Sequence, residues 1–149
     1  MNIHVVRPDG SWYSRPDITL VRDADRFCLP DDCTGALACR GRCIRIAKSG
    51  KAIAARFARR YFDSWAPAIL FYGLLTDGSI TPYLDRATVV GREFRPVSEL
   101  DSAELEQMTA HVVRISLHIS YRIGDFIVFE QDPPVPLGRG GRLGNIDIL

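Results

Sequence analysis

The chain has 149 residues and a mass of 16.7 kDa, with 46% hydrophobic and 25% charged residues. This composition is that of one globular domain, which we expect to span residues 1–149, and it excludes disordered, collagen-like and coiled-coil proteins. The 19 basic and 18 acidic residues give a net charge of +1, which argues against a protein whose whole surface binds nucleic acid.

The N-terminal part is predicted to be mostly strand. Ile3–Val6 and Ser11–Tyr13 flank an Arg-Pro-Asp-Gly turn, which predicts a hairpin. Short strand-like segments follow at Ile18–Val21 and Phe27–Leu29, and the alternation in Ile44–Ile46 predicts a half-buried strand.

Two helices are predicted farther along the chain. Over Lys51–Trp65, apolar residues recur at four-residue steps with arginines on the other side, which is an amphipathic helical pattern. Asp101 and Glu104 form a capping-box pattern before a helix of about five turns that ends at Ile119. Its apolar face consists of Leu105, Met108, Val112, Ile115 and Ile119.

The remaining segments are predicted to be strands. They are Ala68–Leu75, Thr88–Phe94, Tyr121–Phe129 and Ile146–Leu149. No internal repeat or long linker divides the chain, so the elements together predict a mostly β, α+β fold.

Four cysteines lie close together in the sequence, at Cys28, Cys33, Cys39 and Cys43. Thiolates favour tetrahedral zinc, but the spacing lacks the tight knuckles of structural zinc sites. We therefore expect reduced thiols without zinc.

Residues 40–60 contain eight basic residues and no acidic residue. Such a segment could bind phosphate groups, or it could be the solvated side of a strand and a helix. His111, Arg114 and His118 share one side of the second predicted helix, and we interpret them as its polar flank, because no nucleophile or orienting acid accompanies them.

Three stretches, taken in order, resemble the fumarylacetoacetate hydrolase superfamily, especially its short bacterial members. The first, within Arg45–Asp63, is a strand, a Gly-Lys turn and the segment after it. The second, within Leu84–Ser98, is a Leu-Asp-Arg-Ala stretch that ends in Gly. The third, within Tyr121–Val128, is a Gly-Asp-Phe-Ile run after the long predicted helix.

The resemblance implies a mixed β-sheet roll with two helices, usually in a homodimer. Active members hold Mg²⁺ or a similar cation through three carboxylates and break carbon–carbon bonds or remove CO₂ in dicarbonyl acids. Here the first two carboxylate positions fall within Cys39–Cys43, and the third falls at Leu70. The lysine of the family is replaced by Pro82 or Tyr83 and its threonine by Phe129, so we expect no metal and no other cofactor.

These substitutions predict a catalytically inactive relative that is retained as a structural or small-anion-binding domain. Arg40, Arg42 and Arg45 are the candidate ligands of a small carboxylate or phosphate, because a guanidinium donates to two oxygens at once.

Two alternatives remain. One is an active hydrolase or lyase of dicarbonyl acids, whose metal ligands would be among Asp63, Asp77, Asp85 and Glu93. The other is an anion- or nucleic-acid-binding module that uses residues 40–60, although the charge balance makes nucleic acid the less expected partner.

The longest apolar runs, such as Ala66–Leu75, contain about ten residues, fewer than the about twenty of a membrane span. Met1–Leu20 also lacks the charged start and apolar middle of a signal peptide. We therefore expect a cytoplasmic homodimer with no membrane partner.

Overall fold

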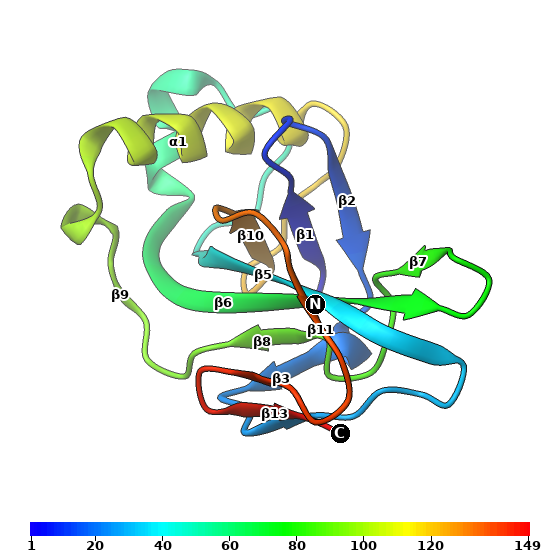
Figure 1. The fold of residues 1–149 in the computed structure, drawn as a ribbon. Helices are drawn as coiled ribbons and strands as arrows, with labels where there is room; N and C mark the ends of the chain where they lie inside the picture. The colour runs from blue at the N-terminus through cyan, green and yellow to red at the C-terminus, as the bar shows by residue number, and fades with distance from the viewer.

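The computed structural model describes residues 1–149, and its main feature is a ten-stranded mixed sheet that curls on itself (Figure 1). The strand order is β2-β1-β10-β5-β6-β8-β3, with β11 added to β5 and both β7 and β9 added to β6. These strands are β1 Ile3–Val6, β2 Trp12–Arg15, β3 Leu20–Arg22, β5 Cys33–Ile46, β6 Phe62–Leu75, β7 Ile80–Thr81, β8 Thr88–Val90, β9 Arg95–Pro96, β10 Phe126–Glu130 and β11 Val135–Leu137.

A small sheet and one α-helix complete the structure. The small sheet has the order β12-β13-β4 and lies near the C-terminus, at the bottom of Figure 1, whereas the helix crosses the top. The strands are β4 Arg26–Phe27, β12 Arg142–Leu143 and β13 Ile146–Ile148. The helix is α1 Ser102–Ser116, and three 3-10 helices are η1 Asp17–Thr19, η2 Ala55–Arg60 and η3 Val97–Glu99.

The two long strands β5 and β6 form the centre of the sheet. Each has 14 residues, and they pair antiparallel from Cys33 opposite Leu75 to Ile46 opposite Phe62. Because successive side chains of a strand point to opposite faces, this ladder has two distinct sides.

The inner face of the sheet carries Cys39, Cys43 and Leu70, which pack with Ile3 and Val128 in one apolar cluster. The outer face carries two further clusters. One lies between the sheet and α1 and includes Ile44 and Val112, and the other lies against the small sheet and includes Ala38, Phe71 and Ile146. The sheet is thus covered on both sides, as a rolled sheet requires.

The predicted α+β, mostly β class is confirmed, as are several of its elements. The opening hairpin is β1 with β2, paired antiparallel from Ile3 and Arg15 to Val6 and Trp12. The second predicted helix is α1, although it ends at Ser116 and has about four turns. Asp101 is its N-cap residue but makes no side-chain capping hydrogen bond, and the Glu104 side chain accepts instead from Arg42 of β5.

The predicted helix over residues 51–65 is wrong. Only η2 is helical there, and β6 begins at Phe62, so that Trp65 pairs across the ladder with Ile44. The four-residue spacing of apolar side chains reflects a short 3-10 helix followed by a strand, and the pairing of β6 with β5 outweighs the local periodicity.

The predicted strand Thr88–Phe94 is limited to β8, which pairs with β6 on one side and with β3 on the other. Thr88–Val90 is therefore an interior strand and offers no open edge. No helix of the structure has both the length and the apolar character that crossing a lipid bilayer requires.

Candidate functional site

Three positions on the inner face correspond to the metal carboxylates that the resemblance implies. Cys39 and Leu70 are direct partners across the β5–β6 ladder, and both are at most 1% exposed. Gly41 follows on the same side of β5, and a Cβ atom there would collide with the carbonyl oxygen of Phe129. These positions therefore supply one buried thiol and no carboxylate.

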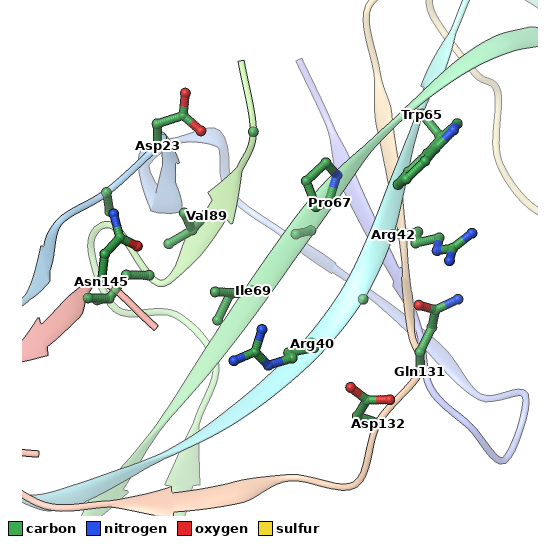
Figure 2. A pocket seen from close by; sticks show the side chains of 15 residues that line it. Asp23, Arg40, Arg42, Trp65, Pro67, Ile69, Val89, Gln131, Asp132 and Asn145 are labelled. Carbon is green, nitrogen blue, oxygen red and sulfur yellow. The ribbon is translucent and has the colours of Figure 1, made fainter. Parts of the chain in front are cut away.

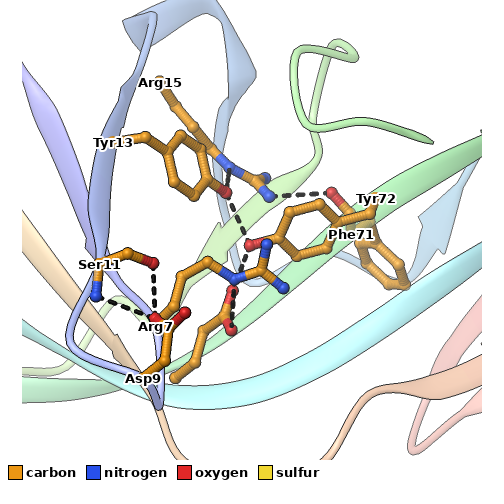
Figure 3. Close-up of polar contacts among 8 residues, drawn as sticks. Arg7, Asp9, Ser11, Tyr13, Arg15, Phe71 and Tyr72 are labelled. Atoms are coloured by element: carbon orange, nitrogen blue, oxygen red, sulfur yellow. Dashed lines mark hydrogen bonds and ion pairs between the residues drawn. The ribbon is translucent and has the colours of Figure 1, made fainter. Parts of the chain in front are cut away.

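A chain of polar side chains lies beside these positions; its members come from β2, β6 and β10 and from the turn directly after β1 (Figure 3). The Arg15 Nε donates to the Tyr13 hydroxyl at 2.9 Å, and this hydroxyl donates to the Tyr72 hydroxyl at 2.7 Å. Tyr72 donates in turn to Glu130, and the other oxygen of Glu130 lies 3.6 Å from the Arg7 Nε. The five residues form one connected group, which we call the inner network.

Alternation along the strands explains why these residues meet. In the β1–β2 pairing, Arg15 lies opposite Ile3, and Tyr13 lies opposite Val5, whose side chains are both on the inner face. Glu130 extends the inner-facing series of β10 that begins at Phe126.

Arg15 is the buried end of the network, with 2% of its surface exposed. Besides Tyr13, its guanidinium donates to the carbonyl oxygens of Phe71 and Ala87 and to the hydroxyl of Thr88. Its donors are thus used by neutral acceptors, and no carboxylate pairs with it. A buried charge without a counter-ion is costly unless another charge compensates it.

The charges of the inner network do not cancel. Arg7 and Arg15 contribute two positive charges, and Glu130 contributes one negative charge. Asp9, which also lies near Arg7, is exposed to water and accepts from Ser11 (Figure 3). The network as a whole therefore carries one excess positive charge, with Arg7 as its partly exposed cation.

The neutral groups of this region stay protonated at neutral pH. Burial, together with the nearby Glu130 carboxylate, raises the pKa of the Cys39 thiol to about 11. Burial also raises the pKa of Tyr13, and burial together with the hydrogen bond to Glu130 raises the pKa of Tyr72. Neither phenol nor the thiol is ready to lose a proton.

The inner network opens on a hollow of about 260 Å³, which we call the inner hollow. Arg7, whose side chain is 46% exposed, lies in its wall with Tyr13, Cys39 and Tyr72. The remaining wall is apolar or aromatic and consists of Leu37, Ile80, Pro82, Tyr83 and Pro134. Such a wall, with one partly exposed guanidinium, suits an organic anion with an apolar body.

The structure shows where the residues lie that stand in place of the lysine and the threonine of the family. Pro82 and Tyr83, where the resemblance expects a lysine, do line the inner hollow. Phe129, where it expects a threonine, packs instead on the outer face in the cluster beneath α1. The neighbouring Glu130 is the residue of β10 that reaches the inner network.

A divalent cation does not fit the inner site. Glu130 is the carboxylate of the inner network, and it is occupied by Tyr72 and Arg7. The alternative acids Asp63, Asp77, Asp85 and Glu93 are exposed on separate segments, and no group of three His, Cys, Asp or Glu side chains is arranged to hold a metal. The structure therefore does not bring together the alternative ligand set.

The candidate arginines of β5 do not occupy the space of the lost carboxylates. Arg40 and Arg42 lie on the opposite face of the strand from Cys39 and line a different cavity, of about 490 Å³, which we call the outer hollow (Figure 2). Arg45 lies elsewhere, 4.5 Å from the centre of the Phe94 ring.

The rest of the basic segment is spread over the surface. Lys48 lies over Tyr61, and Arg56 and Arg60 lie over Phe57. Arg59 lines a groove between η2 and α1. The eight positive charges of residues 40–60 thus do not converge on one cavity.

The cysteines and histidines lie outside a common site. Cys28 is exposed, whereas the other three cysteines are buried along β5. His111 and Arg114 are neighbours on α1, at 2.8 Å, while His118 is exposed beyond its end.

The sequence pattern did not identify the inner network. Its members are spread from Arg7 to Glu130, and neither their spacing nor their local pattern resembles a motif. The one available signal was strand alternation, which places Tyr13 and Arg15 on the same side of β2. That side becomes buried because the curled sheet brings Tyr72 and the carbonyl groups of Phe71 and Ala87 against it.

Solved enzymes share this fold. The fumarylpyruvate hydrolase of Pseudomonas aeruginosa, solved with Mn²⁺ and pyruvate, matches with a TM-score of 0.74 and 14% identity over 94% of this chain and 82% of its own. The maleylpyruvate hydrolase of Sphingobium sp. SYK-6 matches with a TM-score of 0.79 and 12% identity over 99% of this chain and 70% of its own.

A fumarylacetoacetate hydrolase family protein of Yersinia pestis CO92 matches with a TM-score of 0.75 and 12% identity over 99% of this chain and 92% of its own. No protein-family model and no curated protein matches the chain. At these identities the likeness concerns the fold, and the chain has the fold of the fumarylacetoacetate hydrolase superfamily.

Proposed function

We propose that this protein is a relative of the fumarylacetoacetate hydrolase superfamily that has lost metal-dependent catalysis and binds a small organic anion in the inner hollow. The observation that carries the proposal is the side-chain chemistry at Cys39, Gly41 and Leu70. These residues line up on the inner face of β5 and β6 without a single carboxylate. Because Mg²⁺ and Mn²⁺ require hard oxygen ligands, the cation of active relatives has no binding group here.

The excess charge of the inner network supports the binding of an anion. Arg7 and Arg15 face one carboxylate, that of Glu130, and Arg7 is the cation that reaches the inner hollow. A carboxylate bound to Arg7 balances the charge of the region and accepts two parallel hydrogen bonds from the guanidinium.

The apolar wall selects the rest of the ligand. Ile80, Pro82 and Tyr83 offer contacts to a short hydrocarbon or acyl chain attached to the carboxylate. A 2-oxo acid combines these features, and pyruvate, present in the Pseudomonas enzyme, is a suitable first probe.

The ligand remains chemically unchanged in this site. Tyr13, Tyr72 and Cys39 keep their protons, and Glu130 is engaged by Tyr72 and Arg7. No group is therefore free to move a proton or to stabilise an enolate.

Calorimetry with pyruvate and oxaloacetate at pH 7 tests the binding. We expect millimolar or tighter dissociation constants, and a loss of about ten-fold or more in Arg7→Gln, because hydrogen bonds to a charged group are lost. Arg122→Gln, at an exposed position outside the inner hollow, is the matched control and keeps the affinity. Absence of binding, or equal binding by Arg7→Gln, contradicts the anion site.

Turnover is tested separately, with oxaloacetate and an acylpyruvate in the presence of Mg²⁺ or Mn²⁺. The expected rate equals that of the same metal solution without protein. Saturable metal-dependent turnover refutes the loss of catalysis, whatever the calorimetry shows.

A further inference from the structure

The outer hollow is a second cavity that the proposed function does not use. It lies on the outer face of β5 and β6, so the two central strands separate it from the inner hollow. Its volume of about 490 Å³ lies in the range of small-molecule sites, roughly 300–1,000 Å³.

The floor of the outer hollow is apolar. Figure 2 shows Pro67 and Ile69 of β6 beside Val89 of β8, with Asn145 and Asp23 on the far side. The floor can therefore hold a hydrocarbon or aromatic group, whereas the polar rim faces the solvent.

Two charged side chains of the rim have no partner in the chain. Neither Arg40 nor Asp132 belongs to any of the ion pairs of the protein. The other charged side chains that line the hollow are paired: Arg42 binds Glu104 at 2.8 Å, and Asp23 lies 3.8 Å from Arg92. The unpaired charges are thus confined to Arg40 and Asp132.

The backbone holds these two residues next to each other. The carbonyl oxygen of Arg40 accepts hydrogen bonds from the backbone N–H groups of Gln131, at 3.0 Å, and Asp132, at 3.4 Å. In Figure 2 the Arg40 side chain extends toward Ile69 and the apolar floor, whereas Arg42 extends the other way. A cation and an anion therefore flank the floor from one edge without neutralising each other.

We infer that the outer hollow binds a zwitterionic α-amino acid with an apolar side chain. The ligand carboxylate binds the Arg40 guanidinium, its ammonium binds the Asp132 carboxylate, and its side chain lies on Ile69 and Val89. The carboxamide of Asn145, on the opposite rim, offers a neutral hydrogen-bonding group to a longer ligand.

The charge of the rim argues against a purely anionic ligand. Arg42 is bound to Glu104 and Asp23 is paired with Arg92, so the charges left for a ligand are those of Arg40 and Asp132, which are opposite in sign. A phosphate, with no positive group to meet Asp132, is repelled where a zwitterion is attracted. Of the carboxylate or phosphate that the sequence predicts for Arg40, Arg42 and Arg45, this inference keeps the carboxylate, at Arg40, and adds an ammonium group at Asp132.

Calorimetry and methyl NMR with L-leucine and L-phenylalanine test this inference directly. The comparison ligands are 3-phenylpropionate, which lacks the ammonium, phenethylamine, which lacks the carboxylate, and inorganic phosphate. We expect millimolar or tighter binding of the amino acids, with shifts at the Ile69 and Val89 methyl groups, and binding weaker by about ten-fold or more when either charge is missing.

Two variants that each remove one charge assign the roles of the two side chains. Arg40→Gln should remove the advantage of L-phenylalanine over phenethylamine, and Asp132→Asn should remove its advantage over 3-phenylpropionate. Both side chains are exposed, so the melting temperature should stay within about 1–2 °C of the parent value. Arg7→Gln, in the inner hollow, is the control and leaves amino-acid binding unchanged.

Three results overturn the inference: no binding of either amino acid, equal binding of 3-phenylpropionate or phosphate, or unchanged binding by both Arg40→Gln and Asp132→Asn. Because the probes and variants differ from those of the inner hollow, either proposal can fail while the other holds.

Discussion

At the scale of single residues, Gly41 explains why the inner site differs from a metal centre. It lies opposite Glu130 in the β5–β10 pairing and is buried. The space where its side chain would begin is filled by the carbonyl oxygen of Phe129. A carboxylate cannot be restored at Gly41 without moving the backbone of β10.

Gly41→Ala is therefore expected to destabilise the protein. Overpacking against a backbone atom costs about 1–3 kcal/mol, which corresponds to a fall in melting temperature of roughly 2–10 °C. Differential scanning calorimetry measures the shift. Gly138→Ala is the control, since a Cβ there meets nothing within 4 Å, and its melting temperature should be unchanged or slightly higher.

The inner network could not be selected from the sequence. An arginine such as Arg15, between Ser14 and Pro16, looks like an ordinary surface residue. Its burial results from pairing with Ile3 and from carbonyl groups supplied by Phe71 and Ala87, more than fifty residues away. Hydrogen-bond acceptors that come from distant parts of the chain cannot be recognised in the sequence around the arginine.

At the scale of elements, the two predicted helices differ in where the structure places their apolar residues. In α1 the residues at helical spacing, including Leu105, Met108 and Val112, are all buried in one cluster beneath the helix. In the segment around η2, Phe57 is only half-buried, and Trp65 belongs to β6. A helical period is a dependable guide over four turns, but over a shorter stretch the pairing of a neighbouring strand can override it.

Two adjacent valines of α1 test this assignment. Val112 is fully buried, whereas Val113 lies at the edge of the groove between η2 and α1 and is half-buried. Val112→Ala should lower the free energy of unfolding by about 2–3 kcal/mol, because it removes buried methyl groups and leaves a cavity. Val113→Ala should cost less than half as much in the same urea titration. Equal costs contradict the burial of that helix face.

At the scale of the whole molecule, the open edges of the curled sheet favour association between copies of the chain. The terminal strands are β2 and β3, whereas β8 is paired on both sides. Apolar side chains of Ile80, Tyr83 and Val135 are also exposed, at 53%, 55% and 44%. Open strand edges and exposed apolar groups both favour association between copies.

We accordingly predict a homodimer, as the resemblance to the superfamily implies. Light scattering at micromolar concentration should give a mass of about twice 16.7 kDa, with a dimer that persists in high salt because its contacts are apolar and main-chain. A single species of 16.7 kDa contradicts the prediction.

Two histidines, His4 on the opening hairpin and His111 on α1, are expected to make the stability of the folded protein depend on pH. His4, on β1, is 4% exposed and bonds Ser14 through Nδ1 at 2.7 Å, while its Nε2 is buried without a partner. Burial lowers the pKa of His4 below 6.5, and the Asp125 charge only partly opposes the shift. Burial, with the charge of Arg114, also lowers the pKa of His111.

The direction of the effect follows from proton linkage. Below pH 6.5 the unfolded chain binds protons at these histidines more readily than the folded chain, so the stability is complete above pH 6.5 and is lost as the pH falls toward the folded-state pKa values. Asp9 and Asp77, whose pKa values are lowered by hydrogen bonds from Ser11 and Ser79, act in a separate window below about pH 4.

Melting curves between pH 7.5 and 5 separate the contributions. The melting temperature should fall over this interval, and His4→Asn, which can keep the hydrogen bond to Ser14 but does not titrate, should flatten the fall. His118→Asn, at an exposed position near Trp12, should leave the slope unchanged. If His4→Asn retains the full slope, protonation of the buried imidazole does not lower the stability, and the dependence must come from His111 on α1.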